Sequence, residues 1–199
     1  MKNIFRENSQ LSALFYFLLT QIFIFSNPAR AEEISFPREC LSALGRYSQS
    51  KYLDVLSSSG AISLYRLEKT HSAQEIYRLT ILNPLSGTRS INVNVNATSN
   101  VGILTDYVKS GIDNERTSST FLIESEKVKK LQIAFQAKEF RDLKSQEGCI
   151  GCKDGSQWLL ESFVNGRYKC VEDREPSQGM VRNIGTILLG YTVDSSEKK

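Results

Sequence analysis

The chain has 199 residues, and its 25 basic and 22 acidic side chains give a net charge of +3. Nucleic-acid binding and electrostatic membrane docking both need a dense basic surface, so this near balance of charges argues against both functions. The densest basic group, Lys127, Lys129 and Lys130, adjoins Glu124 and Glu126 and is interpreted as the solvated face of a helix.

The first 31 residues have the three-part pattern of an export signal. Basic residues near the start precede an apolar run over residues 11–25, and the small-x-small motif Ala29-Arg30-Ala31 follows. We expect cleavage after Ala31 and export to the periplasm or the medium. The alternative is an uncleaved anchor, although the apolar run is shorter than the ~20 residues of a spanning helix. No later segment is predicted to span a membrane, and residues 32–199 are predicted to form one domain.

Apolar spacing predicts one helix followed by three strands in the first half of that domain. The predicted segments are a helix over 41–56, a loop over 57–60, a strand from 61, and strands over 75–82 and 88–96. In the last of these strands, Ile91, Val93 and Val95 alternate with asparagines. One side of the sheet is therefore expected to be solvated, which is the pattern of an antiparallel sheet.

The second half is predicted to contain strands, a long helix and a closing helix. The predicted segments are a loop over 97–116 with one short strand, a strand over 118–123, a helix from 125 to 140, a helix over 178–191 and a frayed polar tail over 192–199. Ser125 is the expected cap of the long helix. Val128, Leu131 and Phe135 form its apolar stripe, and a second apolar arc, Ile133, Ala137 and Phe140, predicts burial on a further side.

A β-hairpin is the strongest local prediction. Asn165-Gly166, the preferred pair for a type I′ turn, separates strands predicted over 156–164 and 167–172. The register then places Glu161 opposite Cys170, and Glu161 and Glu172 on one face. Paired carboxylates can serve acid–base catalysis, but strand register alone also brings charges together, and the structural interpretation is favoured.

The hairpin residues resemble a known signature. The matching segments are Asp154-Gly155-Ser156-Gln157-Trp158-Leu159-Leu160-Glu161, Asn165-Gly166-Arg167-Tyr168 and Pro176. They are similar to the D-G-x-x-W-x-x-E…G-x-Y-H…R-W-x-P signature of small exported bacterial proteins of unknown function. Lys169 stands at the histidine position, and the segment before Pro176 lacks the tryptophan. The resemblance implies an exported protein and carries no activity with it.

Four cysteines are expected to pair after export. We favour Cys149–Cys152 with Cys40–Cys170, and the alternative is Cys40–Cys149 with Cys152–Cys170. The Cys149-x-x-Cys152 spacing also suits a thiol–disulfide exchange site, but a turn and a strand follow it instead of the helix that lowers a thiol pKa. A zinc site is disfavoured because Cys40 and Cys170 lack knuckle spacing.

The predicted fold is α+β, with a mostly antiparallel sheet packed against two or three helices. No residue is predicted to be catalytic, metal-binding or cofactor-binding, since His71 is the only histidine and lies in a polar loop.

The favoured function is an exported, non-catalytic binding or structural module. Its partner is expected to be a protein or small ligand of the exported compartment and not nucleic acid. Trp158, Glu161 and Tyr168 on the hairpin are the candidate interaction residues. The alternative is an enzyme that exchanges thiols and disulfides through Cys149 and Cys152.

Overall fold

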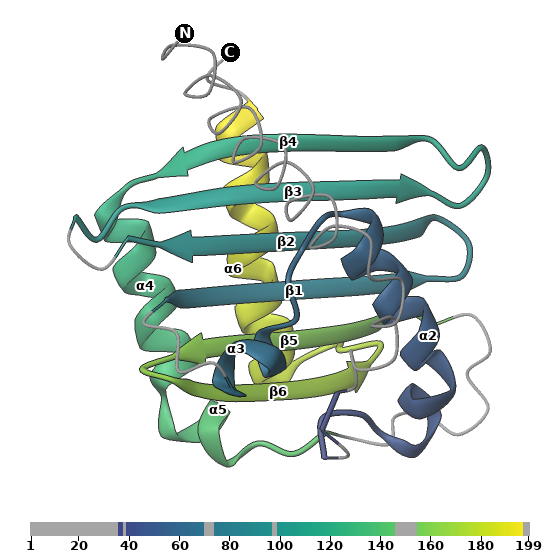
Figure 1. Ribbon diagram of the computed structural model, residues 1–199, viewed down its shortest axis with the longest axis horizontal. Helices are drawn as coiled ribbons and strands as arrows, with labels where there is room; N and C mark the ends of the chain where they lie inside the picture. Colours follow the sequence, from purple (N-terminus) through teal and green to yellow (C-terminus); the bar gives the residue numbers. More distant parts are fainter. Residues whose placement is uncertain (1–35, 38, 70–73, 97–98, 146–154, 197–199) are drawn as a thin grey trace, which may run out of the picture. The chain divides into compact units, whose positions relative to one another are not determined.

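The described residues form a six-stranded antiparallel sheet with helices on both faces, as shown by the computed structural model in Figure 1. The structure describes residues 36–37, 39–69, 74–96, 99–145 and 155–196, all within one compact unit, Ser35–Lys199. The signal-like segment therefore lies outside the described residues. The predicted α+β class, with a mostly antiparallel sheet, is confirmed.

The strands are β1 (Glu75–Asn83), β2 (Gly87–Val95), β3 (Gly102–Ser110), β4 (Arg116–Ile123), β5 (Gln157–Val164) and β6 (Arg167–Arg174). The helices are α2 (Ala43–Ser58), α3 (Leu64–Lys69), α4 (Ser125–Gln136), α5 (Lys138–Asp142) and α6 (Gly179–Ser196). The spatial strand order is β4-β3-β2-β1-β5-β6. β1 to β4 form a meander, and the chain then returns through α4 and α5 to add the β5–β6 hairpin beside β1 (Figure 1).

The two faces of the sheet bury different kinds of side chain. The α6 face, which α4, α5 and α6 cover, is apolar and carries Tyr77, Leu79 and Ile91 in the main core. The α2 face, which α2 and α3 cover over part of its width, carries two smaller apolar clusters and several buried polar groups. The predicted solvated side of β2 is therefore solvated at Asn94 but buried at Asn92.

The segment before β1 is a helix, and the strand predicted there is wrong. α3 begins at Leu64, and the Ser63 Oγ accepts a 3.3 Å hydrogen bond from the backbone N–H of Arg66. A hydroxyl in this place caps a helix N-terminus. Leu64 is fully buried against Ile76 and Phe163. The strand prediction depends on the alternation of Ile62 and Leu64 with Ser63 and Tyr65. Four residues are too few to fix a strand, and the burial of this leucine favours the helix.

The predicted loop over 97–116 contains β3, which is an inner strand. Its pattern is obscured because Asp106 occupies the α6 face among apolar neighbours. Arg89 of β2 binds both oxygens of this carboxylate, at 2.9 Å to Oδ1 and 2.7 Å to Oδ2. This two-bond contact satisfies the charge and allows an aspartate inside the sheet.

The helix predicted over 125–140 is divided in two. Ala137 has φ −56° and ψ 142°, which is not helical, so α4 ends before it and α5 begins after it. The expected cap at Ser125 is also wrong, because Glu124 is the N-cap residue and makes no side-chain capping bond.

The apolar stripe of α4 behaves as its spacing predicts, but the second arc does not. Val128, Leu131 and Phe135 are buried, whereas the Ile133 side chain is 65% exposed. Phe140 is buried from α5 instead, where its ring meets Phe135 edge-on at 4.9 Å between centroids. The two predicted apolar sides therefore do not belong to one helix: α4 buries the first stripe, and the separate helix α5 buries Phe140.

The closing helix α6 is confirmed and continues through Ser196, into the segment predicted as a polar tail. Thr192 is held by Arg89, whose Nη2 donates to the threonine Oγ1 at 2.7 Å. Gly185 is required in the helix, since a Cβ there would lie 2.3 Å from the Trp158 ring. Neither α6 nor another helix in the described ranges is long and apolar enough to cross a membrane.

The β5–β6 hairpin is confirmed in turn type and register. Asn165 has φ 51° and Gly166 has φ 72°, as a type I′ turn requires. Phe163 pairs with Tyr168, and Glu161 with Cys170. The turn is the element that sets which side chains of the two strands share a face.

Gly166→Val is expected to lower the free energy of unfolding by about 1–2 kcal/mol, because a β-branched residue is strained at positive φ. Apart from the two adjacent residues, no atom lies within 4 Å of the Cβ position, so the loss reports backbone strain and not a clash. Urea unfolding measures the change, with Gly166→Asn as the control that tolerates this φ. An unchanged midpoint in the valine variant would contradict a type I′ turn.

Candidate functional site

The hairpin brings together most of the residues that the sequence singled out. Alternation along β5 and β6 places Glu161, Tyr168, Cys170 and Glu172 on the α2 face. Trp158, three positions before Glu161, lies on the α6 face. The structure therefore joins two of the three candidate interaction residues and separates the third.

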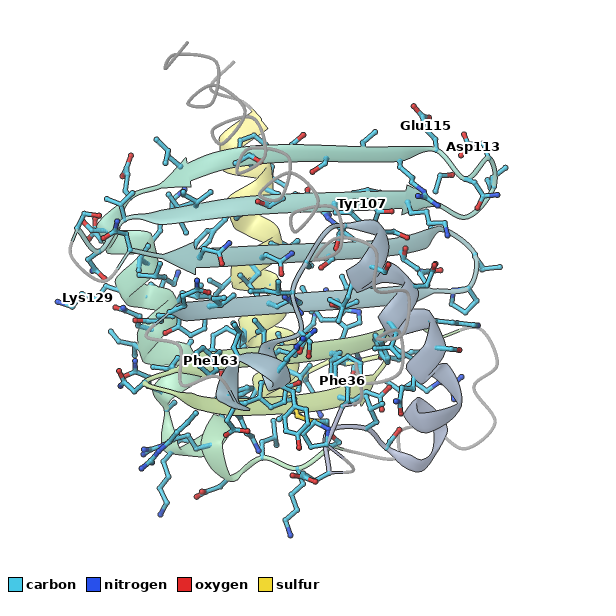
Figure 2. All side chains as sticks on the ribbon, viewed as in Figure 1. Phe36, Tyr107, Asp113, Glu115, Lys129 and Phe163 are labelled. Atoms are coloured by element: carbon cyan, nitrogen blue, oxygen red, sulfur yellow. A yellow bond between two sulfur atoms is a disulfide. The ribbon has the colours of Figure 1, made fainter. Side chains whose placement is uncertain are left out.

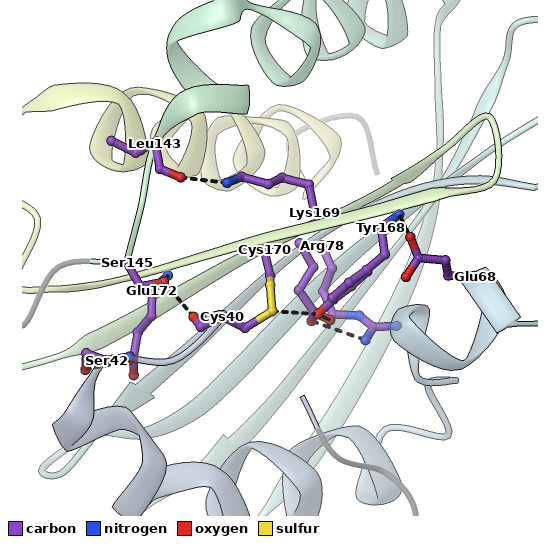
Figure 3. The surroundings of a disulfide bond; sticks show 11 residues. Cys40, Ser42, Glu68, Arg78, Leu143, Ser145, Tyr168, Lys169, Cys170 and Glu172 are labelled. Atoms are coloured by element: carbon purple, nitrogen blue, oxygen red, sulfur yellow. Dashed lines mark hydrogen bonds and ion pairs between the residues drawn. A yellow bond between two sulfur atoms is a disulfide. The ribbon is translucent and has the colours of Figure 1, made fainter. Parts of the chain in front are cut away.

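Cys40 and Cys170 form a disulfide between the segment before α2 and the edge strand β6 (Figure 3). Their Cα atoms are 5.2 Å apart, and both side chains are buried. This confirms one bond of the favoured pairing and contradicts the alternative connectivity. It also removes two of the four thiolates that a shared zinc site needs. Cys149 and Cys152 lie outside the described residues, so their pairing stays a prediction.

Glu161 is occupied by a buried ionic contact. Its Oε2 lies 3.3 Å from Arg78 Nη1, and its Oε1 accepts a 2.9 Å hydrogen bond from the Tyr168 hydroxyl. Both the arginine and the glutamate are 1% exposed. Arg78 also donates to the side-chain oxygen of Asn92 and, at 2.7 Å, to the carbonyl of Ile62 between α2 and α3. The contact ties three strands to the loop that crosses them.

Glu172 anchors the start of α2. One carboxylate oxygen accepts hydrogen bonds from the backbone N–H and the hydroxyl of Ser42, both at 2.8 Å. The other accepts a 2.9 Å bond from the Tyr52 hydroxyl. A carboxylate at a helix N-terminus also stabilises the helix dipole. The two carboxylates share a face, as the register predicts, but each is held by its own structural partners.

The two tyrosines stay protonated donors. Burial, followed by the charge of Glu172 and the bond to it, raises the pKa of the Tyr52 hydroxyl well above its usual value. Burial and then Glu161 raise the pKa of Tyr168 in the same direction, although part of the Tyr168 side chain remains exposed. Each hydroxyl therefore donates to its carboxylate throughout the physiological range.

Trp158 is a core residue. It is 5% exposed, and its indole Nε1 donates to the Ser156 hydroxyl at 3.0 Å. Gly185 of α6 packs directly on the ring, and the Arg182 guanidinium lies 5.1 Å from the ring centroid. The indole fixes the position of α6 and is closed to a stacking ligand.

A cleft of about 570 Å³ opens beside the outer edge of β6. The segment after α5 forms one wall, because Lys169 Nζ donates to the Leu143 carbonyl at 2.6 Å. Ser145 Oγ accepts from the Glu172 backbone N–H at 2.9 Å and donates to the Cys40 carbonyl at 2.6 Å. These bonds hold the chain against β6 up to the point where the segment that contains Cys149 and Cys152 begins.

Arg78, Asn92 and Ser42 were not identified from the sequence as part of this cluster. Arg78 had one available signal: it sits at an inward position of the strand pattern, between Ile76 and Thr80. An arginine there requires a buried acceptor, but the sequence does not say which one. His71, the solvated histidine of the sequence analysis, lies outside the described residues.

Comparison of the chain with protein-family models and with curated proteins finds no match. The similarity of the hairpin residues to small exported bacterial proteins therefore stays a prediction.

Proposed function

We propose that this chain is an exported, non-catalytic binding module. The single observation that carries the proposal is the buried Cys40–Cys170 bond beside two buried carboxylates that are each held internally. Such contacts make a rigid platform of the sheet with α2 and α3, and they leave neither Glu161 nor Glu172 free for chemistry. A disulfide in this place suits an oxidising compartment, in agreement with the export signal that the sequence predicts.

The surface that best suits a protein partner is the outer part of the α2 face. Ile103 and Leu122 lie opposite each other on β3 and β4, and they are 47% and 76% exposed. Thr105 and Thr120 pair two positions further along the same strands and present hydroxyls on the same face. On the neighbouring strand β2, Asn94 pairs with Ile103. An apolar centre with a polar surround is the common anatomy of a protein interface.

Affinity capture from the native compartment tests this surface. The mature chain should capture a partner, and Leu122→Glu should bind that partner about tenfold or more weakly, because the introduced charge cannot be buried against it. Ile112→Glu is the matched control, since Ile112 is 91% exposed on the turn between β3 and β4. Equal retention by both variants would contradict the proposed surface.

Thiol–disulfide exchange is the alternative function. Mapping the disulfides of the oxidised chain, with and without reductant, distinguishes it from a binding module. Mass mapping under non-reducing conditions should find the Cys40–Cys170 bond, and mild reductant should leave it intact because it is buried. If Cys149→Ser removes a measurable exchange activity without loss of stability, the chain is an enzyme and the proposal of a non-catalytic binding module is wrong.

A further inference from the structure

A second cleft, of about 440 Å³, lies on the α6 face at the end of the β5–β6 hairpin. This volume lies within the ~300–1,000 Å³ of typical ligand pockets. Its described lining residues are Phe135 and Gln136 of α4, Arg141 of α5, Ser162 and Val164 of β5, Asn165 of the turn, and Arg167 and Lys169 of β6. It is separate from the Ile103–Leu122 surface, which is on the α2 face.

Three cations and no acidic side chain are found among these described lining residues. Arg167 and Lys169 are two positions apart on β6, so strand alternation turns both toward the α6 face. The break at Ala137 starts α5 at an angle that brings Arg141 to the same cleft. Like charges gathered in this way repel one another, and a bound anion relieves the repulsion.

The cations are available to a ligand. Among the described residues, the Arg141 and Arg167 guanidinium groups have no ion-pair or hydrogen-bond partner, and both side chains are exposed. Lys169 Nζ is positioned by its bond to the Leu143 carbonyl. Burial lowers the pKa of this ammonium, while Asp142 and Glu39, which line the neighbouring cleft, act in the opposite direction.

We propose that this basic cleft binds a small molecule through an oxyanion head, a carboxylate or a phosphate. The planar guanidinium groups of Arg141 and Arg167 suit two-bond contacts with such a head. The amides of Gln136 and Asn165 and the hydroxyl of Ser162 supply further donors, and Val164 with Phe135 gives an apolar wall for the rest of the molecule.

The lysines of α4 show what a merely solvated basic group looks like in this chain. Lys129 points outward from α4 (Figure 2), and the hollow it lines also contains Glu124 and Glu126. That hollow therefore contains acidic side chains beside its lysines, whereas the described lining of the basic cleft contains none. Lys129 and Lys130 provide a matched control that removes the same charge outside the cleft.

Titration of the isotopically labelled mature chain with inorganic phosphate and, separately, with benzoate tests the proposal by NMR. At constant ionic strength, millimolar probe should give saturable shifts of the amides of residues 165–169. The double variant Arg141→Gln/Arg167→Gln should weaken the binding by about tenfold or more, and Lys129→Gln/Lys130→Gln should leave it unchanged. The probe that binds more tightly identifies the head group.

Two results would overturn the site: no saturable shift with either probe, or equal affinity in the cleft variant and the wild type. Both substituted arginines are exposed and make no side-chain ion pair or hydrogen bond with another described residue, so the variant is expected to stay folded, and its unperturbed amides verify this in the same spectra. Loss of the anion site leaves the capture experiment on Leu122 unaffected, so the two proposals fail separately.

Discussion

Removal of the Cys40–Cys170 disulfide is expected to lower the free energy of unfolding by roughly 3–5 kcal/mol. The two cysteines are 130 positions apart, so the bond closes most of the domain into one loop and strongly restricts the unfolded chain. It also joins the segment before α2 to β6, where Glu172 binds Ser42. Without the bond, we expect α2 to separate from the sheet more readily than the β-meander opens.

The double variant Cys40→Ala/Cys170→Ala is preferred for this measurement because it leaves no unpaired thiol to exchange with Cys149 or Cys152. Guanidinium unfolding gives the change in free energy, and Cys149→Ala/Cys152→Ala is the control. A bond between Cys149 and Cys152 closes a very short loop and should contribute far less. Equal losses in the two double variants would show that loop closure does not explain the stability.

The parts of the fold that the sequence predicted are those governed by local chemistry. Asn165-Gly166 determines its turn through the backbone angles those two residues tolerate, and the register of the hairpin follows from it. That register correctly placed Glu161 and Glu172 on one face. The apolar stripe of α4 was likewise visible, because its residues repeat at helical spacing within one segment.

The parts that the sequence did not predict depend on distant partners. Asp106 belongs in an inner strand only because Arg89 on the neighbouring strand binds it. Leu64 favours a helix only when Phe163, about 100 positions later, is there to cover it. The burial of Arg78 likewise depends on a distant residue, since its acceptor Glu161 follows 83 positions later. Spacing within a window cannot identify contacts of this kind.

Loss of one partner of the Arg78–Glu161 contact is expected to be as severe as loss of the disulfide. Arg78→Met leaves a buried Glu161 carboxylate, 1% exposed in the native chain, with the Tyr168 hydroxyl as its one donor among the described residues. An uncompensated charge in this position costs roughly 3–5 kcal/mol of unfolding free energy. Glu161→Gln leaves the arginine charge buried beside Asn92 and the Ile62 carbonyl and should be destabilising for the same reason.

A double-mutant cycle separates the ionic contact from simple loss of packing. Arg78→Met/Glu161→Gln removes both charges, so it should lose clearly less than the sum of the single variants. Lys109→Met is the control, because its 3.2 Å contact with Asp54 is partly exposed and should contribute less than about 1 kcal/mol. Additive losses at Arg78 and Glu161 would mean that the two side chains stabilise the sheet independently. A large coupling energy would show that this buried pair holds β1, β5 and the loop before α3 together as one rigid platform, which is the property that the proposed binding function requires.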